Sequence, residues 1–163
     1  MNKKTITVKM GYVDRPNKNG FIIPKKVMEH AIKEKFKDST VWGMLGCTLD
    51  GRIQLSKVTH CIKEPPVIEG DEIIGEILLM EHSDINPDIG IVEAMDEIVC
   101  APCGYGTVKD RGDGVMEVQP CYELISFNIV APDIGTEESD KIVDKFLKNN
   151  EIQKDIHMIN DFF

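Results

Sequence analysis

The sequence is poor in the features that would assign it to several large classes of protein. It has only five cysteines in 163 residues, an odd number that does not suit a disulfide-stapled scaffold and fits a reducing compartment. It has no run of about 20 apolar residues, so no membrane-spanning helix is expected. The apolar core of a secretory signal is also missing, which predicts a soluble protein that is not secreted.

Positive charge is scarce as well. Lys and Arg number 19 against 28 Asp and Glu, and the net charge of −9 repels nucleic-acid phosphates. The basic concentration between Lys3 and Lys37 is interspersed with acids from Glu29 onward, which favours a solvated surface. We therefore expect neither a nucleic acid nor a membrane as partner.

Apolar periodicity predicts the secondary structure. Residues 5–13 alternate as a half-buried strand does, and residues 24–37 repeat apolar side chains at helical spacing after Pro24. Short helices are expected after Asn86 and Thr136. Further strands are predicted at residues 41–45, 53–58, 72–80, 98–100, 105–109, 115–119 and 123–130. This pattern predicts an α+β fold, a largely antiparallel sheet or barrel with helices packed outside. The predicted domain spans residues 1–135, and residues 136–163 form a C-terminal helix and an apolar tail.

The cysteines suggest two kinds of site, each with a simpler explanation. Cys100 and Cys103 form a C-x-x-C pair, and with His60 and Cys61 they could bind zinc, although buried small cysteines in neighbouring strands explain the same facts. A thioredoxin-like site is not expected, because Gly104 follows the motif where a helix should begin. No cofactor and no metal is therefore predicted.

Five segments, in chain order, resemble the tailed-phage prohead proteases, which trim capsid proteins during head maturation. They are residues 17–32, 53–62 with Val58-Thr59-His60, 69–78, 104–108 and 122–130. The resemblance spans about residues 14–132. It implies a fold similar to the herpesvirus assemblin proteases, a twisted antiparallel barrel with surrounding helices, in agreement with the α+β pattern.

The positions that the resemblance aligns with catalytic residues carry other side chains here. Cys47 stands where the family has its histidine, Ala101 and Pro102 where it has the nucleophilic serine run, and Asn128 where an aspartate is common. Cys103 replaces the arginine. Loss of a triad nucleophile or base costs on the order of 10⁴ to 10⁶ in turnover, so the sequence predicts a chain that is not an enzyme.

The function predicted on this basis is a non-catalytic structural, auxiliary or decorating component of the phage capsid, made in the host cytoplasm and incorporated into the virion. Its expected partners are the major capsid protein or other head proteins, with homo-oligomers possible on the capsid lattice. The apolar tail offers candidate partner-binding residues: Ile152, Ile156, Ile159, Phe162 and Phe163.

Two alternatives stay open. The chain could be an active maturation protease with a displaced thiol nucleophile, Cys103 or Cys47, and His60 or His82 as base. It could also be a zinc- or redox-active cysteine module.

Overall fold

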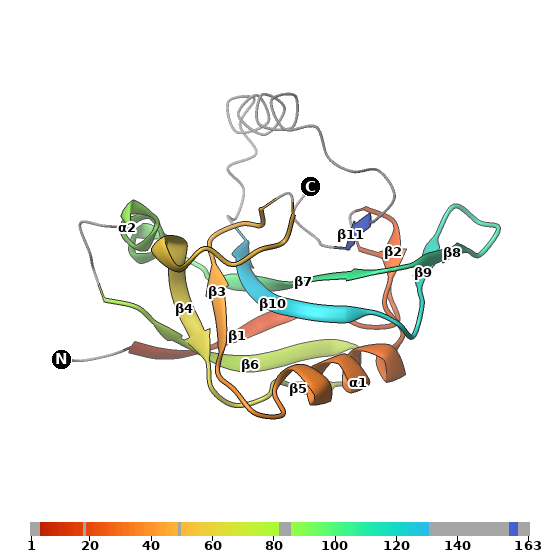
Figure 1. Cartoon of the computed structure of the whole chain (residues 1–163), viewed down its shortest axis with the longest axis horizontal. Coiled ribbons are helices and arrows are strands. Elements are labelled where there is room, and N and C mark those ends of the chain that lie inside the picture. The colour runs from red at the N-terminus through yellow and green to blue at the C-terminus, as the bar shows by residue number, and fades with distance from the viewer. Residues whose placement is uncertain (1–3, 18, 49, 82–85, 131–156, 160–163) are drawn as a thin grey trace, which may run out of the picture.

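The computed structural model describes residues 4–17, 19–48, 50–81, 86–130 and 157–159 (Figure 1). Within these ranges the chain forms mostly antiparallel strands with two α-helices, which confirms the predicted α+β class. The elements are β1 (Lys4–Tyr12), β2 (Phe21–Ile22), α1 (Lys25–Lys35), β3 (Val41–Met44), the 3₁₀ turn η1 (Leu55–Lys57), β4 (Val58–Ile62), β5 (Val67–Glu69), β6 (Glu72–Leu79), α2 (Pro87–Ala94), β7 (Val99–Gly106), β8 (Val108–Asp110), β9 (Met116–Val118), β10 (Glu123–Val130) and β11 (His157–Ile159).

The largest sheet is built around β6. One edge of β6 pairs with β1 along most of its length, from Lys4 opposite Leu79 to Tyr12 opposite Glu72. Its other edge pairs with β5 near the start of the strand and with β4 near its end, and β3 follows β4 at the sheet margin. Isoleucines on the inner face, among them Ile73 and Ile77, are fully buried.

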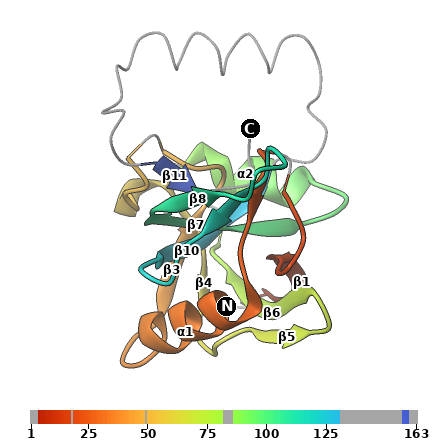
Figure 2. The ribbon, with the colours of Figure 1, turned by 90° about the vertical axis from the view of Figure 1, so that its right-hand side faces the viewer.

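A second sheet, ordered β10-β7-β11, packs against the first, and Figure 2 shows β7 and β10 lying above β1 and β6. Strand β1 contacts β7 and strand β3 contacts β10. The predicted barrel is wrong in one respect: within the described residues no ladder closes it, because the only backbone pairing between this part of the chain and β10 is a single parallel bridge just after β3, Leu45 to Ile129. A third, small sheet joins β2, β9 and β8.

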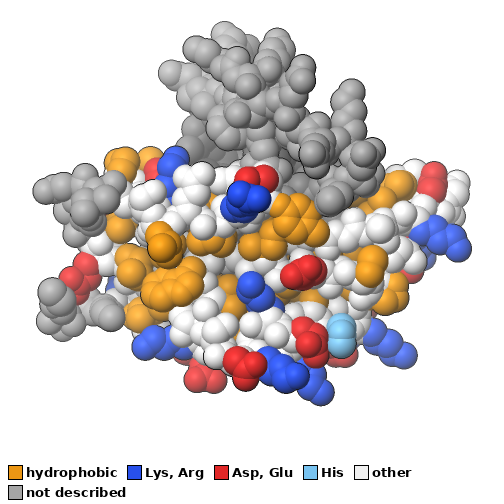
Figure 3. All heavy atoms as spheres, viewed as in Figure 1, with side chains coloured by type: hydrophobic (Ala, Val, Ile, Leu, Met, Phe, Trp, Pro, Cys, Tyr) orange, Lys and Arg blue, Asp and Glu red, His pale blue; other side chains and the backbone are white. Residues whose placement is uncertain are grey.

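Both predicted helices in the described residues are present, and each has a capping device. The N–H of Lys25 donates to the Asp14 carboxylate at 2.9 Å, so α1 is capped from the preceding turn. In α2 the side chain of Asn86 accepts from Asp88 N at 3.1 Å, as the sequence predicts. The outer face of α1 carries interspersed acidic and basic side chains, visible along the lower part of Figure 3.

The core lies between the two large sheets and α1. Phe127 is completely buried at its centre with Met10 and Met28, and the burial of one such side chain stabilises the fold by about 1.5–3 kcal/mol. The buried face of α1 contributes residues at the predicted spacing of three and four, namely Val27, Met28, Ala31 and Ile32.

Two strand predictions are wrong in detail. Residues 53–58 were expected to form one strand, but residues 55–57 form a 3₁₀ turn and β4 begins at Val58. Residues 98–100 and 105–109 were expected to be separate strands, but residues 99–106 form the continuous strand β7, because β10 supplies partners across Cys100 to Tyr105. The predicted helix after Thr136 lies outside the described residues, and no described helix is long and apolar enough to span a bilayer.

Candidate functional site at the junction of β3, β7 and β10

The junction of three strands brings together residues that are far apart in the sequence. Strand β10 pairs with β7 so that Ser126 lies opposite Cys103 and Asn128 opposite Ala101. On its other side β10 holds the end of β3, because Ser126 Oγ donates to Trp42 O at 2.7 Å and Gly46 N donates to Ile129 O at 2.8 Å. The chain therefore leaves β3 beside β10.

Cys47 is positioned by a turn directly after β3. Gly46 adopts a φ of +77°, the left-handed conformation that glycine favours, and redirects the chain. The following loop is internally bonded: the Thr48 hydroxyl lies 3.0 Å from both Asp50 Oδ1 and Arg52 O. These contacts fix the backbone on both sides of the Cys47 thiol.

The central feature of the site is a pair of thiols, Cys47 and Cys103. Cys103 is fully buried, whereas Cys47 is half-buried and its Sγ donates to Thr48 O at 3.4 Å. The hydrogen bond between the two sulfurs, followed by burial, raises the pKa of Cys103 far above the ordinary thiol value. Cys103 therefore stays protonated, and Cys47 is the less buried of the two cysteines.

His60 lies in the next strand, β4, and its ring is completely buried. Its Nε2 lies 2.8 Å from Phe127 O and its Nδ1 lies 3.0 Å from Thr59 Oγ1. A carbonyl only accepts, so Nε2 carries the proton and Nδ1 accepts from the threonine hydroxyl. Burial lowers the pKa of His60 to about 4, despite the Phe127 carbonyl. The imidazole is neutral at pH 7, and both of its nitrogens are engaged.

Asn128 joins β10 to β3 through only one of the two polar atoms of its side-chain amide. Its Oδ1 accepts from Met44 N at 3.0 Å, while its buried Nδ2 has no hydrogen-bond partner. The Tyr122 hydroxyl is a second buried group without a partner, and burial, followed by the nearby cysteines, raises the pKa of Tyr122. Two unpaired polar groups near one cluster are uncommon in a folded protein.

Two further positions of the predicted protease site, Ala101 and Pro102, lie in β7 with Cys103 and carry no reactive side chain. Ala101 and Pro102 are buried in β7, opposite Asn128 and Phe127. Tyr105, two residues past Cys103, is partly exposed beside the loop that follows Cys47. Burial and the Asp50 carboxylate raise the pKa of Tyr105.

The candidate zinc ligands Cys100, Cys103, His60 and Cys61 do not form a metal site in the described part of the chain. Within the described residues, no group of three or more His, Cys, Asp or Glu side chains could hold a metal ion. The Cys103 thiol is hydrogen-bonded to Cys47, and both ring nitrogens of His60 are hydrogen-bonded within the protein. Burial raises the pKa of Cys100 to about 12, so its thiol is a poor ligand at neutral pH.

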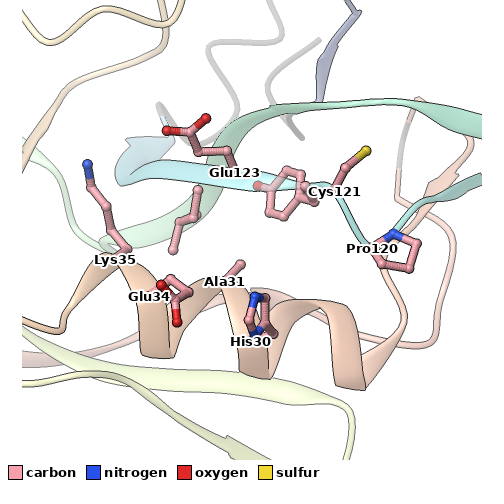
Figure 4. Close-up of a pocket in the computed structure, with 9 residues that line it drawn as sticks. His30, Ala31, Glu34, Lys35, Pro120, Cys121 and Glu123 are labelled. Atoms are coloured by element: carbon pink, nitrogen blue, oxygen red, sulfur yellow. The ribbon is translucent and has the colours of Figure 1, made fainter.

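A groove of about 440 Å³ lies between α1 and the start of β10 (Figure 4). The α1 side chains are those of His30, Ala31, Glu34 and Lys35, and residues 120–124 form the other wall. Neither Cys47 nor Cys103 lines this groove. Cys121 stands at its rim, where the hydrogen bond from Thr107, 3.2 Å away, lowers the pKa of the thiol.

No protein-family model matches the sequence, and no curated protein matches it either. The fold, in contrast, is that of a phage prohead protease. The solved structure of the bacteriophage T4 capsid assembly protease, gp21, superposes with a TM-score of 0.68 over 78% of this chain and 81% of that chain, at 19% sequence identity. This similarity supports the prohead-protease-like fold that the five segments imply, without the closed barrel.

The comparison contradicts the prediction that the chain is not an enzyme. A solved structure with this fold is that of a capsid assembly protease, an enzyme. At 19% identity the similarity establishes the fold alone, so the chemistry has to be argued from the residues of this chain.

Of the two proposed bases for a thiol nucleophile, His60 is fully engaged elsewhere and His82 lies outside the described residues. The sequence named Cys47 and Cys103 separately, but nothing in it indicated their contact, which depends on the pairing of β10 with β7. Of the candidate tail residues, only Ile159 belongs to a described strand.

Proposed function

We propose that this chain is a head-assembly protein of a tailed bacteriophage and that it cleaves head proteins with Cys47 as the nucleophile. The observation that carries the proposal is the contact between the Cys47 and Cys103 thiols in a fold shared with a capsid assembly protease. The family resemblance aligns both cysteines with catalytic positions. Major capsid or scaffold chains are the proposed partners.

The two thiols have different roles in this proposal. Cys47 is partly accessible and is the sulfur that attacks the substrate in this proposal. Cys103 is buried and remains protonated, so it acts as a positioning donor. His60 is excluded as the base by its geometry, and in this proposal the Cys47 thiol gives up its proton to water as it attacks.

The reaction would then follow ordinary thiol chemistry. The Cys47 sulfur attacks the scissile carbonyl carbon and forms a carbon–sulfur bond, the carbon–nitrogen bond breaks, and the leaving amine takes up a proton from water. Water hydrolyses the thioester, which releases the carboxylic acid and restores the thiol. Because the buried His60 supplies no proton at neutral pH, both proton transfers are assigned to water.

Co-expression with the major capsid protein of the source phage tests the proposal. Mass spectrometry should find capsid fragments with the unmodified chain and none with Cys47→Ser. Cys103→Ser should slow cleavage, and Cys121→Ser is the matched control because Cys121 lies at the separate groove. Cleavage that persists in Cys47→Ser would contradict the thiol mechanism. If the unmodified protein leaves the capsid chains uncut, proteolysis is contradicted. Binding to head proteins would then be the remaining function.

The proposal also places the chain in the assembling head. Quantitative mass spectrometry of purified proheads and mature heads should detect it in the proheads. Its copy number in mature heads would show how much of it is retained as a virion component. Absence from both particles would contradict a role in the head.

A further inference from the structure

Strand β7 has two partners, and the second one comes from the end of the chain. Strand β10 pairs with one edge of β7, and β11 pairs antiparallel with the other. His157 lies opposite Gly106, Met158 opposite Tyr105 and Ile159 opposite Gly104 (Figures 1 and 2). Gly104 directly follows Cys103, so β11 lies at the edge of the thiol site.

The edge of a strand binds extended peptides with little regard to their sequence. Its free N–H and C=O groups form ladder hydrogen bonds with any chain that lies alongside, which is the basis of peptide recognition by strand addition. In the described residues, β11 alone pairs with residues 104–106 on this edge. It covers three residue positions, a short ladder that a competing strand can replace.

We propose that the edge of β7 from Gly104 to Gly106 is a docking site for an extended peptide, and that β11 occupies it within the same chain. An extended segment of a head protein displaces β11 when it binds, and this identity of the competitor rests on the proposed function. Strand addition here puts the incoming peptide next to the residue that follows Cys103, whose S–H meets Cys47. The tail strand thereby keeps the site occupied until a substrate arrives.

The ladder sets a requirement on the peptide. Proline lacks a backbone N–H, so it is excluded at a paired position whose N–H donates to β7. The chain's own sequence at β11, His157-Met158-Ile159, meets this requirement. Met158 occupies the middle position, and Met158→Pro in the full-length protein is therefore the variant that should release β11.

Hydrogen–deuterium exchange of the full-length protein measures this release. N–H groups alternate along a strand, so at least one amide among residues 104–106 faces β11. In Met158→Pro its exchange should accelerate about fivefold or more, the ratio that corresponds to one ladder hydrogen bond. The matched control is Gln153→Pro, which lies outside β11 and should exchange like the unmodified chain. Unchanged exchange in Met158→Pro would overturn the proposal.

A labelled peptide of residues 151–163 supplies the second arm. Fluorescence anisotropy should show that it binds Met158→Pro more tightly than the unmodified protein, where β11 competes, and that binding restores protection at residues 104–106. The same peptide with proline at position 158 should not bind. Equal binding of both peptides, or no binding of either, would overturn the proposal. So would a dimer of the unmodified protein that Met158→Pro converts to a monomer, because β11 would then come from a second copy.

These measurements are independent of cleavage and can be repeated in Cys47→Ser. Peptide binding without any cleavage of head proteins would contradict the proposed function and leave the docking site standing. Cleavage without peptide binding at β7 would contradict the docking site alone.

Discussion

A single methyl group at Gly43 should break the buried hydrogen bond that joins β4 to β10. Gly43 lies opposite His60 in the β3–β4 ladder. A Cβ at this position would lie 2.2 Å from His60 Nε2 and 2.8 Å from Phe127 O. Both distances are shorter than the contacts that Cβ atoms make in folded proteins. Gly43→Ala therefore forces the imidazole away from the Phe127 carbonyl.

The cost has two parts. Separating His60 from Phe127 leaves a donor and an acceptor unpaired in the core, at about 1–3 kcal/mol. Insertion of a methyl group into a packed core costs about 1–3 kcal/mol more. Together they amount to about 2–6 kcal/mol, a large share of the roughly 5–15 kcal/mol that stabilises a typical domain. The melting temperature should fall by roughly 5–20 °C.

Urea unfolding followed by circular dichroism measures this change. The matched control is Gly90→Ala in helix α2, where no atom lies within 4 Å of the added Cβ. That substitution should stabilise the protein by up to about 1 kcal/mol, because alanine favours a helix. In a His60→Ala background, Gly43→Ala should cost less, since the methyl group gains space. A Gly43→Ala midpoint equal to that of the unmodified chain would refute the close-packing argument.

Three further predictions concern the same region. The pKa of His60, about 4 when folded, lies below its value of about 6.5 in the unfolded chain, so the unfolded state binds more protons between these values and stability is lost as the pH falls from 6.5 toward 4. The free energies of unfolding obtained from urea titrations at pH 7 and pH 4.5 should differ by about 2 kcal/mol. His60→Gln should flatten this dependence and His30→Gln should not, and equal behaviour of the two variants would count against the assignment. Asn128→Asp buries a carboxylate with one hydrogen bond, and burial raises the pKa of the new group. The variant should therefore be least stable above pH 5 and should recover stability as the pH falls. Thermal melts over this pH range can confirm or exclude the trend. Diamide, which accepts two electrons and two protons, should join Cys47 to Cys103 with the loss of two hydrogens, and a peptide map that shows Cys103 joined to another cysteine would contradict their contact.

Local sequence signals are sufficient to predict the elements in which all residues favour the same secondary structure. The alternation in residues 5–13 predicts β1 because one face of that strand is buried, and the apolar spacing after Pro24 predicts α1. Asn86 predicts the start of α2 through a contact only two residues long. In each case the signal and the structure it specifies lie within the same short segment.

The failures share a physical origin in contacts between distant segments. Residues 98–109 contain glycine and proline, which predict an interruption, yet β10 pairs across the whole segment and keeps Pro102 in the strand. The Asp14 cap of α1 also crosses a loop, and no local pattern around Lys25 indicates it. Tertiary pairing outweighs local propensity at these positions.

The thiol site shows the same limit in its chemistry. The family resemblance identifies Cys47, Cys103 and Asn128 from the sequence, but each substituted position, considered alone, predicts only a lost function. The structure places the two thiols in contact, and a hydrogen-bonded pair has properties that neither cysteine has by itself. The buried Cys103 keeps its proton for Cys47, whereas a single cysteine at either position would lack that partner. Cys103→Ala should therefore change the reactivity of Cys47 toward iodoacetamide, and equal alkylation rates with and without Cys103 would show that the contact has no chemical consequence.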